Sequence, residues 1–210
     1  YHVYENQTCD AFGDARYHIY YTTTEVGKKK DKTTQVVLVV STGNHNCITF
    51  GLTYAYSENY ILPISHDEVV HGKYSMINKA PGEYDQKFEG LKAFYGYMMT
   101  HPGKKLSFMG NEFAQFIEWN YNQELDWFLL DYPRHNSFRK FVKDMNHFYL
   151  EHKELWQLDS TYDGFKWIVV DDKENNIASY IRSSADGKYV IVVVNFSPVE
   201  RNKYVMGVPE

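Results

Sequence analysis

The sequence has few cysteines and no long apolar run. Cys9 and Cys47 are the two cysteines among its 210 residues, too few for a disulfide scaffold, and they indicate a reducing compartment. No apolar run approaches the length needed to cross a bilayer, and no segment resembles a signal peptide. We therefore expect a cytoplasmic protein without a membrane partner.

The sequence also lacks an excess of positive charge. Its net charge is −5, and its one basic run, residues 28–30, is followed at once by Asp31. Such a chain creates no field that attracts phosphate backbones, so we expect no nucleic-acid partner. Hydrophobic residues at 43% and charged residues at 23% are ordinary for a globular protein.

Aromatic residues are plentiful. They make up 17% of the chain, with 19 Tyr, 13 Phe and 4 Trp. Flat aromatic faces stack on sugar rings, but they also fill protein cores and interfaces. Composition alone leaves both interpretations open for any single residue.

The first two thirds of the chain change character near residue 44. Residues 1–35 show neither helical nor strand periodicity, and residues 35–40 (QVVLVV) predict a buried strand. Strands are then expected at residues 60–65 and 106–109, and helices at residues 88–98 and 138–149, the second capped by Asn136 or Ser137. Alternating strands and helices indicate a parallel α/β sheet or barrel.

The pattern after residue 159 is β only. Residues 165–170, 177–182 and 189–196 predict strands separated by turn-rich links, and Asp186-Gly187 is a strong hairpin signal. We expect a separate β domain over residues 159–210, which stops before it is complete.

The densest cluster of functional side chains, residues 65–73 (SHDEVVHGK), follows a predicted buried strand. In a barrel, catalytic groups lie at the carboxyl ends of the strands. A metal site is one interpretation, with the ligands His66, Asp67, Glu68 and His71. The two histidines are five residues apart, however, which is not the spacing of the HExxH zinc motif. A polar loop without a ligand and a sugar-binding site where carboxylate and imidazole converge are the other interpretations.

A family resemblance favours the sugar site. Residues 62–73 (LPISHDEVVHGK) resemble the last conserved block of bacterial 1,4-α-glucan (glycogen) branching enzymes of the α-amylase superfamily. The similarity continues in the same order at residues 95–98 (YGYM), 101–106 (HPGKKL), 108–115 (FMGNEFAQ), 118–120 (EWN), 125–127 (LDW), 164–167 (GFKW) and 195–199 (NFSPV).

The resemblance implies a fold and a reaction. Residues 44–158 would be the C-terminal part of a catalytic (β/α)8 TIM barrel, its seventh and eighth strands with their helices, and residues 159–210 the start of an all-β C-terminal domain. The family is a retaining transglycosylase that converts α-1,4 into α-1,6 linkages in glycogen or amylose, and it implies an α-glucan substrate, no cofactor and no metal. Asp67 would be the transition-state stabiliser, and His66 would donate a hydrogen bond to the same sugar.

Further substrate-binding candidates are Glu112 and Trp119, the first placed just past a predicted strand. A structural hydrogen bond would explain Glu112 equally well. Trp119, Tyr121 and Trp127 are candidate glucan-stacking platforms or residues that pack the loop. We expect His71 and Lys73 to support the loop around Asp67.

The chain also departs from the family pattern. The family carries its nucleophile and acid/base on the fourth and fifth barrel strands, and residues 1–43 contain nothing similar to either. We therefore expect residues 1–43 to be foreign to the enzyme and the isolated chain to be inactive. The alternative function is a non-catalytic, truncated fragment with at most weak glucan binding.

Overall fold

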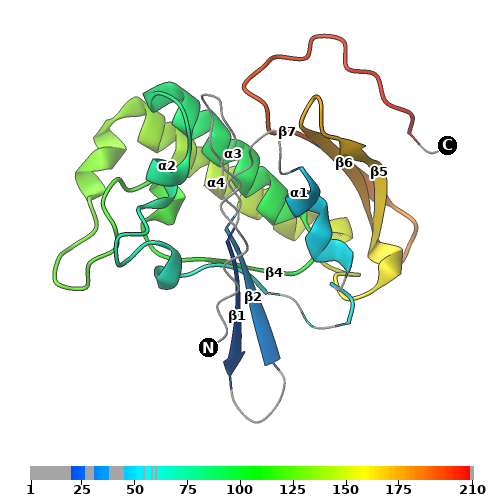
Figure 1. Ribbon diagram of the computed structural model, residues 1–210, viewed down its shortest axis with the longest axis horizontal. Helices are drawn as coiled ribbons and strands as arrows, with labels where there is room; N and C mark the ends of the chain where they lie inside the picture. Colours follow the sequence, from blue (N-terminus) through cyan, green and yellow to red (C-terminus); the bar gives the residue numbers. More distant parts are fainter. Residues whose placement is uncertain are drawn as a thin grey trace.

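The computed structural model describes residues 20–26, 31–37, 45–53, 55–57, 59 and 61–208, with side chains from residue 45 onward. Its α-helices are α1 (Asn46–Phe50), α2 (Met76–Lys79), α3 (Tyr84–Thr100) and α4 (Pro133–Glu151). Its strands are β1 (Tyr20–Val26), β2 (Asp31–Val37), β3 (Ile61–Ile64), β4 (Lys104–Ser107), β5 (Phe165–Asp172), β6 (Ile177–Ser183) and β7 (Tyr189–Asn195). Figure 1 shows α3 and α4 between the loops near α2 and the sheet of β5, β6 and β7.

The first two strands form a hairpin that we did not expect. β1 and β2 pair antiparallel, with Tyr20 opposite Val37 and Val26 opposite Asp31. Residues 20–26 and 31–37 are therefore strands although residues 1–35 show no strand periodicity. The expected strand at residues 35–40 overlaps the end of β2, and residues 38–40 lie outside the described residues. Thr23 lies opposite Thr34 in the register, and threonine favours strands even where the sequence has no apolar alternation.

A parallel β–α–β unit follows. β3 and β4 pair in parallel, from Ile61 opposite Lys104 to Ile64 opposite Ser107, and α3 connects them. The Ile64 carbonyl accepts a hydrogen bond from the Phe108 N–H at 2.8 Å. The main-chain groups of Ile64 therefore point toward β4. Those of the neighbouring Pro63 point to the opposite edge of β3, where the missing N–H donor of proline is tolerated.

β4 begins and ends two residues earlier than the expected strand at residues 106–109. Leu106 and Met109 are 42% and 52% exposed, so the apolar run does not mark a buried strand. The chain turns immediately afterwards, at Gly110, whose φ of 89° favours glycine.

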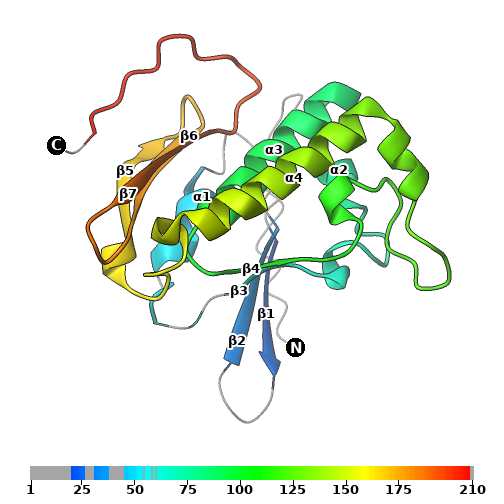
Figure 2. The same ribbon diagram turned by 180° about the vertical axis from the view of Figure 1, so that it is seen from behind.

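The two long helices pack side by side (Figure 2), and buried apolar residues of both belong to one cluster with Leu62 and Ile64 of β3. α3 starts with a capping box between Glu83 and Gln86. Its buried face contains the expected residues Phe88, Leu91, Phe94, Tyr95 and Met98.

α4 starts earlier than expected. Its N-cap is Tyr132 and Pro133 occupies the first turn, so the predicted cap at Asn136 or Ser137 is wrong. Proline explains the earlier start, because its fixed φ suits the first helical position, where no N–H is needed. The Phe138 ring lies 5.3 Å from that of Tyr95, which joins α4 to α3.

The three C-terminal strands form an antiparallel sheet in the order β5-β6-β7. They confirm the strands expected after residue 159, with bounds that differ by one or two residues. The sheet packs on the end of α3: Tyr180 and Thr100 share a side-chain hydrogen bond of 2.6 Å, and the Phe196 ring lies 5.5 Å from that of Tyr97. A single cluster of buried apolar residues therefore runs through α3 and the sheet.

Arg182 on β6 is the most deeply buried charge at this contact. Its side chain is 0% exposed and lies 2.5 Å from the Asp159 carboxylate. It also donates to the main-chain carbonyls of Thr100 at 2.7 Å and Gly164 at 3.1 Å. This one side chain joins the end of α3, the loop before β5 and the central strand of the sheet.

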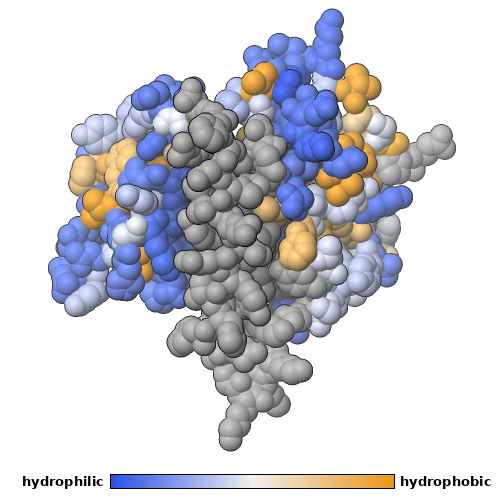
Figure 3. Space-filling view, in the orientation of Figure 1, coloured by the Kyte–Doolittle hydropathy of each residue, from blue (hydrophilic) through white to orange (hydrophobic). Residues whose placement is uncertain are grey.

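The described part of the surface is mixed. In the orientation of Figure 1, its hydrophobic residues reach the surface in small patches between hydrophilic ones (Figure 3). Among the described residues, no helix has the length and apolar character needed to cross a membrane.

Candidate active site

The candidate site lies at the carboxyl ends of the parallel strands. β3 ends at Ile64, and His66 and Asp67 follow in a 3-10 turn, His66–Glu68. β4 ends at Ser107, and Phe108 follows at the same edge, tied to Ile64 by the main-chain hydrogen bond described above. The carboxyl ends of parallel strands are where α/β folds place ligands.

Ser65 sets the direction of the turn. Its backbone is extended, and its hydroxyl accepts a hydrogen bond from the Asp67 N–H at 3.2 Å. The side chains of His66 and Asp67 are 54% and 57% exposed, and His66 Nε2 lies 3.2 Å from Asp67 Oδ1. An imidazole and a carboxylate therefore face solvent side by side, a donor and an acceptor suited to a ligand rich in hydroxyl groups.

Aromatic rings form one wall beside this pair. The His66 ring lies 5.8 Å from Phe108 and 6.2 Å from Trp119, and the last two rings meet edge to face at 5.2 Å. Tyr121, 80% exposed, continues the wall with its ring 6.5 Å from Trp119. The structure thus brings Trp119 to His66, whereas Trp127 lies over Phe113, with ring centroids 5.2 Å apart.

Glu68 is separate from Asp67 although the two are neighbours in sequence. It is 5% exposed, and burial raises the pKa of its carboxyl, opposed by Lys79 and Lys73. The Lys79 ammonium donates to the Glu68 carbonyl, and burial lowers the pKa of Lys79 while Glu68 raises it. Of the two carboxylates, only Asp67 is presented to a ligand in solvent.

The metal interpretation gains no support from the geometry. Within the part of the chain described, no three His, Cys, Asp or Glu residues come together in a way that could hold a metal ion. Glu68, one of the four suggested ligands, is turned into the protein.

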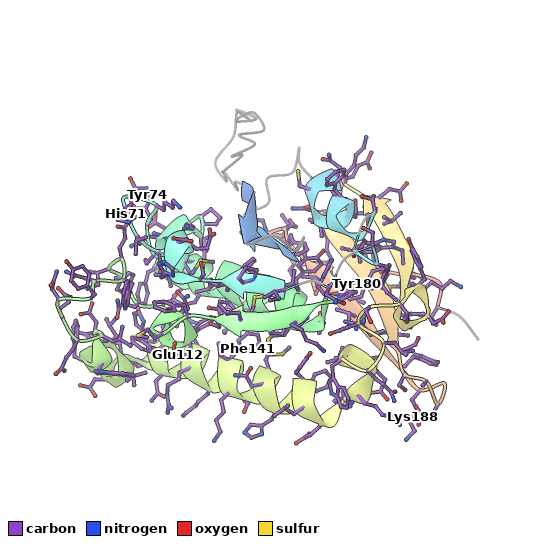
Figure 4. The ribbon with its side chains drawn as sticks, turned by 90° about the horizontal axis from the view of Figure 1, so that it is seen from below. His71, Tyr74, Glu112, Phe141, Tyr180 and Lys188 are labelled. Atoms are coloured by element: carbon purple, nitrogen blue, oxygen red, sulfur yellow. The ribbon has the colours of Figure 1, made fainter. Side chains whose placement is uncertain are left out.

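Glu112 lies in a turn (Asn111–Phe113) flanked by Gly110 and Ala114, which have φ values of 89° and 59°. The Glu112 side chain is half-buried. Burial of Tyr95 is the main cause of the raised pKa of its hydroxyl, and the charge of Glu112 raises that pKa further. Figure 4 shows Glu112 toward α4, apart from His71 and Tyr74. Its role in substrate binding stays a prediction.

Lys73 supports the loop around Asp67 as expected, since its ammonium donates to the Asp67 carbonyl at 2.8 Å. The sequence did not single out Glu118, although its carboxylate accepts hydrogen bonds from the main-chain N–H groups of Gly72 at 3.0 Å and Tyr74 at 2.6 Å. The only signal was its place beside Trp119 in the EWN motif, because contacts to main-chain amides leave no mark in a sequence.

Comparison with known proteins supports the resemblance. The chain is 54% identical over 168 residues to the 1,4-alpha-glucan branching enzyme GlgB of Halothermothrix orenii. The matched region covers 80% of this chain and 27% of that relative. The chain is 52% identical over 166 residues to GlgB of Pseudomonas fluorescens, 79% of this chain and 22% of the relative. Over about four fifths of its length, this chain is therefore similar to part of these branching enzymes.

The chain spans about a quarter of the length of these curated relatives. GlgB of Aquifex aeolicus is 51% identical over 80% of this chain, and the match covers 27% of that relative. The family model described as the alpha amylase C-terminal all-beta domain matches residues 167–210, which contain most of β5 and all of β6 and β7. A match to a cyclomaltodextrinase structure covers 66% of this chain and 21% of that structure's chain, at 18% identity and a TM-score of 0.42.

Proposed function

We propose that residues 44–158 are the C-terminal part of a catalytic (β/α)8 barrel, with β3 and β4 as its seventh and eighth strands, and that residues 159–210 begin the C-terminal β domain. The parallel β3–α3–β4 unit followed by α4 has the order that a barrel requires. The exposed His66 and Asp67 at the strand ends fit the face of a barrel that carries catalysis.

We propose that the whole protein is a branching enzyme that acts on α-glucan. In a retaining transglycosylase, a carboxylate attacks the anomeric carbon, and an acid/base protonates the leaving oxygen and later deprotonates the acceptor hydroxyl. Asp67 takes neither role. Its carboxylate accepts hydrogen bonds from ring hydroxyls, bonds that strengthen as the ring flattens and positive charge develops.

The pairing of His66 with Asp67 is the single observation that carries this proposal. The imidazole is 3.2 Å from the carboxylate and is walled by Phe108 and Trp119. His66 donates to a hydroxyl of the same sugar, and the Trp119 ring limits where that sugar can sit. Trp119 is in this proposal a glucan contact, and Glu112 a second, more distant one.

The 210 residues contain no segment similar to the family's nucleophile and acid/base. The 210-residue chain by itself is therefore a glucan contact surface without turnover, which is the second candidate function.

A full-length chimera tests both candidates. Residues 44–210 of this chain replace the corresponding part of a curated relative, and new α-1,6 linkages formed from amylose are counted. We expect branching by the chimera and none by the 210-residue chain. A folded chimera without branching would contradict the assignment to a branching enzyme, and turnover by the chain alone would contradict the second candidate.

A further inference from the structure

Two loops meet at the rim of the candidate site. The first connects β3 to α3 and carries His66 and Asp67, and the second connects β4 to α4. Phe116 on the second loop offers its carbonyl to the side chains of Ser75 at 2.8 Å and Asn78 at 2.7 Å. The Trp119 N–H donates to the Val69 carbonyl at 2.8 Å.

The first loop holds an unusual backbone conformation between these contacts. His71, Gly72 and Tyr74 have φ values of 59°, 78° and 66°. Positive φ suits glycine, but it costs free energy at His71 and Tyr74, which are both exposed and not held by burial. Figure 4 shows His71 and Tyr74 together at this end of the molecule. Some other interaction must hold the turn.

Glu118 supplies that interaction. Its two carboxylate oxygens each accept a main-chain N–H, Oε2 from Gly72 at 3.0 Å and Oε1 from Tyr74 at 2.6 Å. Lys73 lies between these residues, and its ammonium donates to the Asp67 carbonyl at 2.8 Å. A continuous series of contacts therefore runs from Glu118 through Lys73 to the main chain of Asp67.

We propose that Glu118 is a positioning residue whose ionised carboxylate holds the turn of residues 71–74 and so fixes Asp67 and His66 toward the substrate. The positioning role rests on the proposed function, whereas the hold on the turn does not. Hydrogen bonds to an ionised acceptor are about twice as strong as neutral ones, which suits a carboxylate that offsets backbone strain.

The charge of Glu118 makes this hold dependent on pH. The Gly72 N–H, then the Tyr74 N–H and the positive charges of His71 and Lys79, keep the pKa of Glu118 below its usual range, against the effect of burial. Among the described residues, the titratable groups that act on the Glu118 carboxylate are His71 and Lys79 of the first loop. The pKa of Glu118 is lower in the folded chain than its unfolded value of 4.5. The carboxylate therefore holds the turn fully at pH values above 4.5, and these hydrogen bonds are lost as the pH falls through the pKa of the folded chain.

Glu118→Gln is the informative variant. Glutamine keeps the size but retains one acceptor oxygen, and its amide N–H₂ would face a main-chain N–H. Glu124→Gln is the matched control, because Glu124 is an exposed residue of the same loop.

Amide hydrogen exchange of the 210-residue chain, corrected for intrinsic rates, measures the hold directly. We expect protected Gly72 and Tyr74 amides in the wild type and at least tenfold faster exchange in Glu118→Gln, with no change in Glu124→Gln. Protection of the wild type should fall as the pH drops below 4.5, and Glu118→Gln should lack this dependence. Equal protection in wild type and Glu118→Gln, or no protection in the wild type, would overturn the hold.

The chimera measures the positioning. Glu118→Gln should lower kcat by roughly tenfold to a hundredfold and change KM for amylose by less than about threefold, since misplacing Asp67 affects the transition state more than binding. Loosened amides with unchanged kcat would overturn the positioning role. A wild-type chimera without activity would refute the proposed function and, with it, the positioning of Asp67 by Glu118. The hydrogen-exchange measurement would still show whether Glu118 holds the turn of residues 71–74.

Discussion

Replacing Arg182 by methionine should destabilise the chain strongly. The substitution keeps the volume of the side-chain stem but removes a guanidinium that is 0% exposed and donates to Asp159, Thr100 and Gly164. Asp159, 8% exposed, would keep its ion pair with Lys104 at 3.7 Å, but the Lys104 side chain is 66% exposed and poorly placed to compensate.

The expected loss is about 3 to 5 kcal/mol, the usual cost of leaving a buried charge without its partner. In a chain of this size each kcal/mol lowers Tm by roughly 2 to 4 °C, so Tm should fall by roughly 10 °C. Urea unfolding of the wild type and Arg182→Met gives the free energies of unfolding. The double variant Arg182→Met, Asp159→Asn should recover part of the loss, because the unpaired charge is gone.

Arg134→Met is the control. Arg134 pairs with Asp85 at 2.6 Å and Glu89 at 3.4 Å on the surface, where solvent screens the interaction, and the change in stability should be much smaller. If Arg182→Met remained within about 1 kcal/mol of the wild type, or if the double variant were no better than the single one, the reasoning about the buried pair would be wrong.

Two other substitutions and one activity measurement test further parts of the account. Burial lowers the pKa of His101 to about 3 from 6.5, so between these values the unfolded chain binds a proton that the folded chain does not. The free energy of unfolding should rise across this range of pH, and His101→Asn should reduce the slope. Gly164→Ala should cost about 1 to 3 kcal/mol in urea unfolding, because an added Cβ would overlap the Leu158 carbonyl oxygen and lie 2.7 Å from Leu158 Cβ, whereas Gly207→Ala should be neutral. Incubation of the 210-residue chain with amylose should yield no new α-1,6 linkages, and any turnover above the blank would contradict this.

Elements with strong periodicity were predictable from the sequence. The apolar face of α3 repeats every three or four residues, β7 is an apolar run, and β6 is a short segment rich in apolar residues between turn-rich links. The β1–β2 hairpin was missed because its residues are mainly Thr and Tyr with charges, which fit a strand without an apolar alternation.

The candidate site was predictable only in part. The motif around His66 and Asp67 and the strand before it predicted an exposed pair at a strand end. The roles of Glu118 and Arg182 were not visible, because both act through main-chain groups far away in the sequence. Arg182 is the last residue of the expected strand at residues 177–182 and stands just before a turn-rich segment, so nothing local distinguishes it from a solvated arginine.

The most direct test of the central claim compares two neighbouring carboxylates in the full-length chimera. Asp67 is exposed at the site and Glu68 is buried. Asp67→Asn should lower turnover by about 10³-fold, equivalent to about 4 kcal/mol, with a much smaller change in glucan binding. His66→Ala should cost less, about 1 to 2 kcal/mol, and Glu68→Gln should retain turnover if the chimera folds. Near-normal turnover of Asp67→Asn together with loss of turnover in Glu68→Gln would contradict the account.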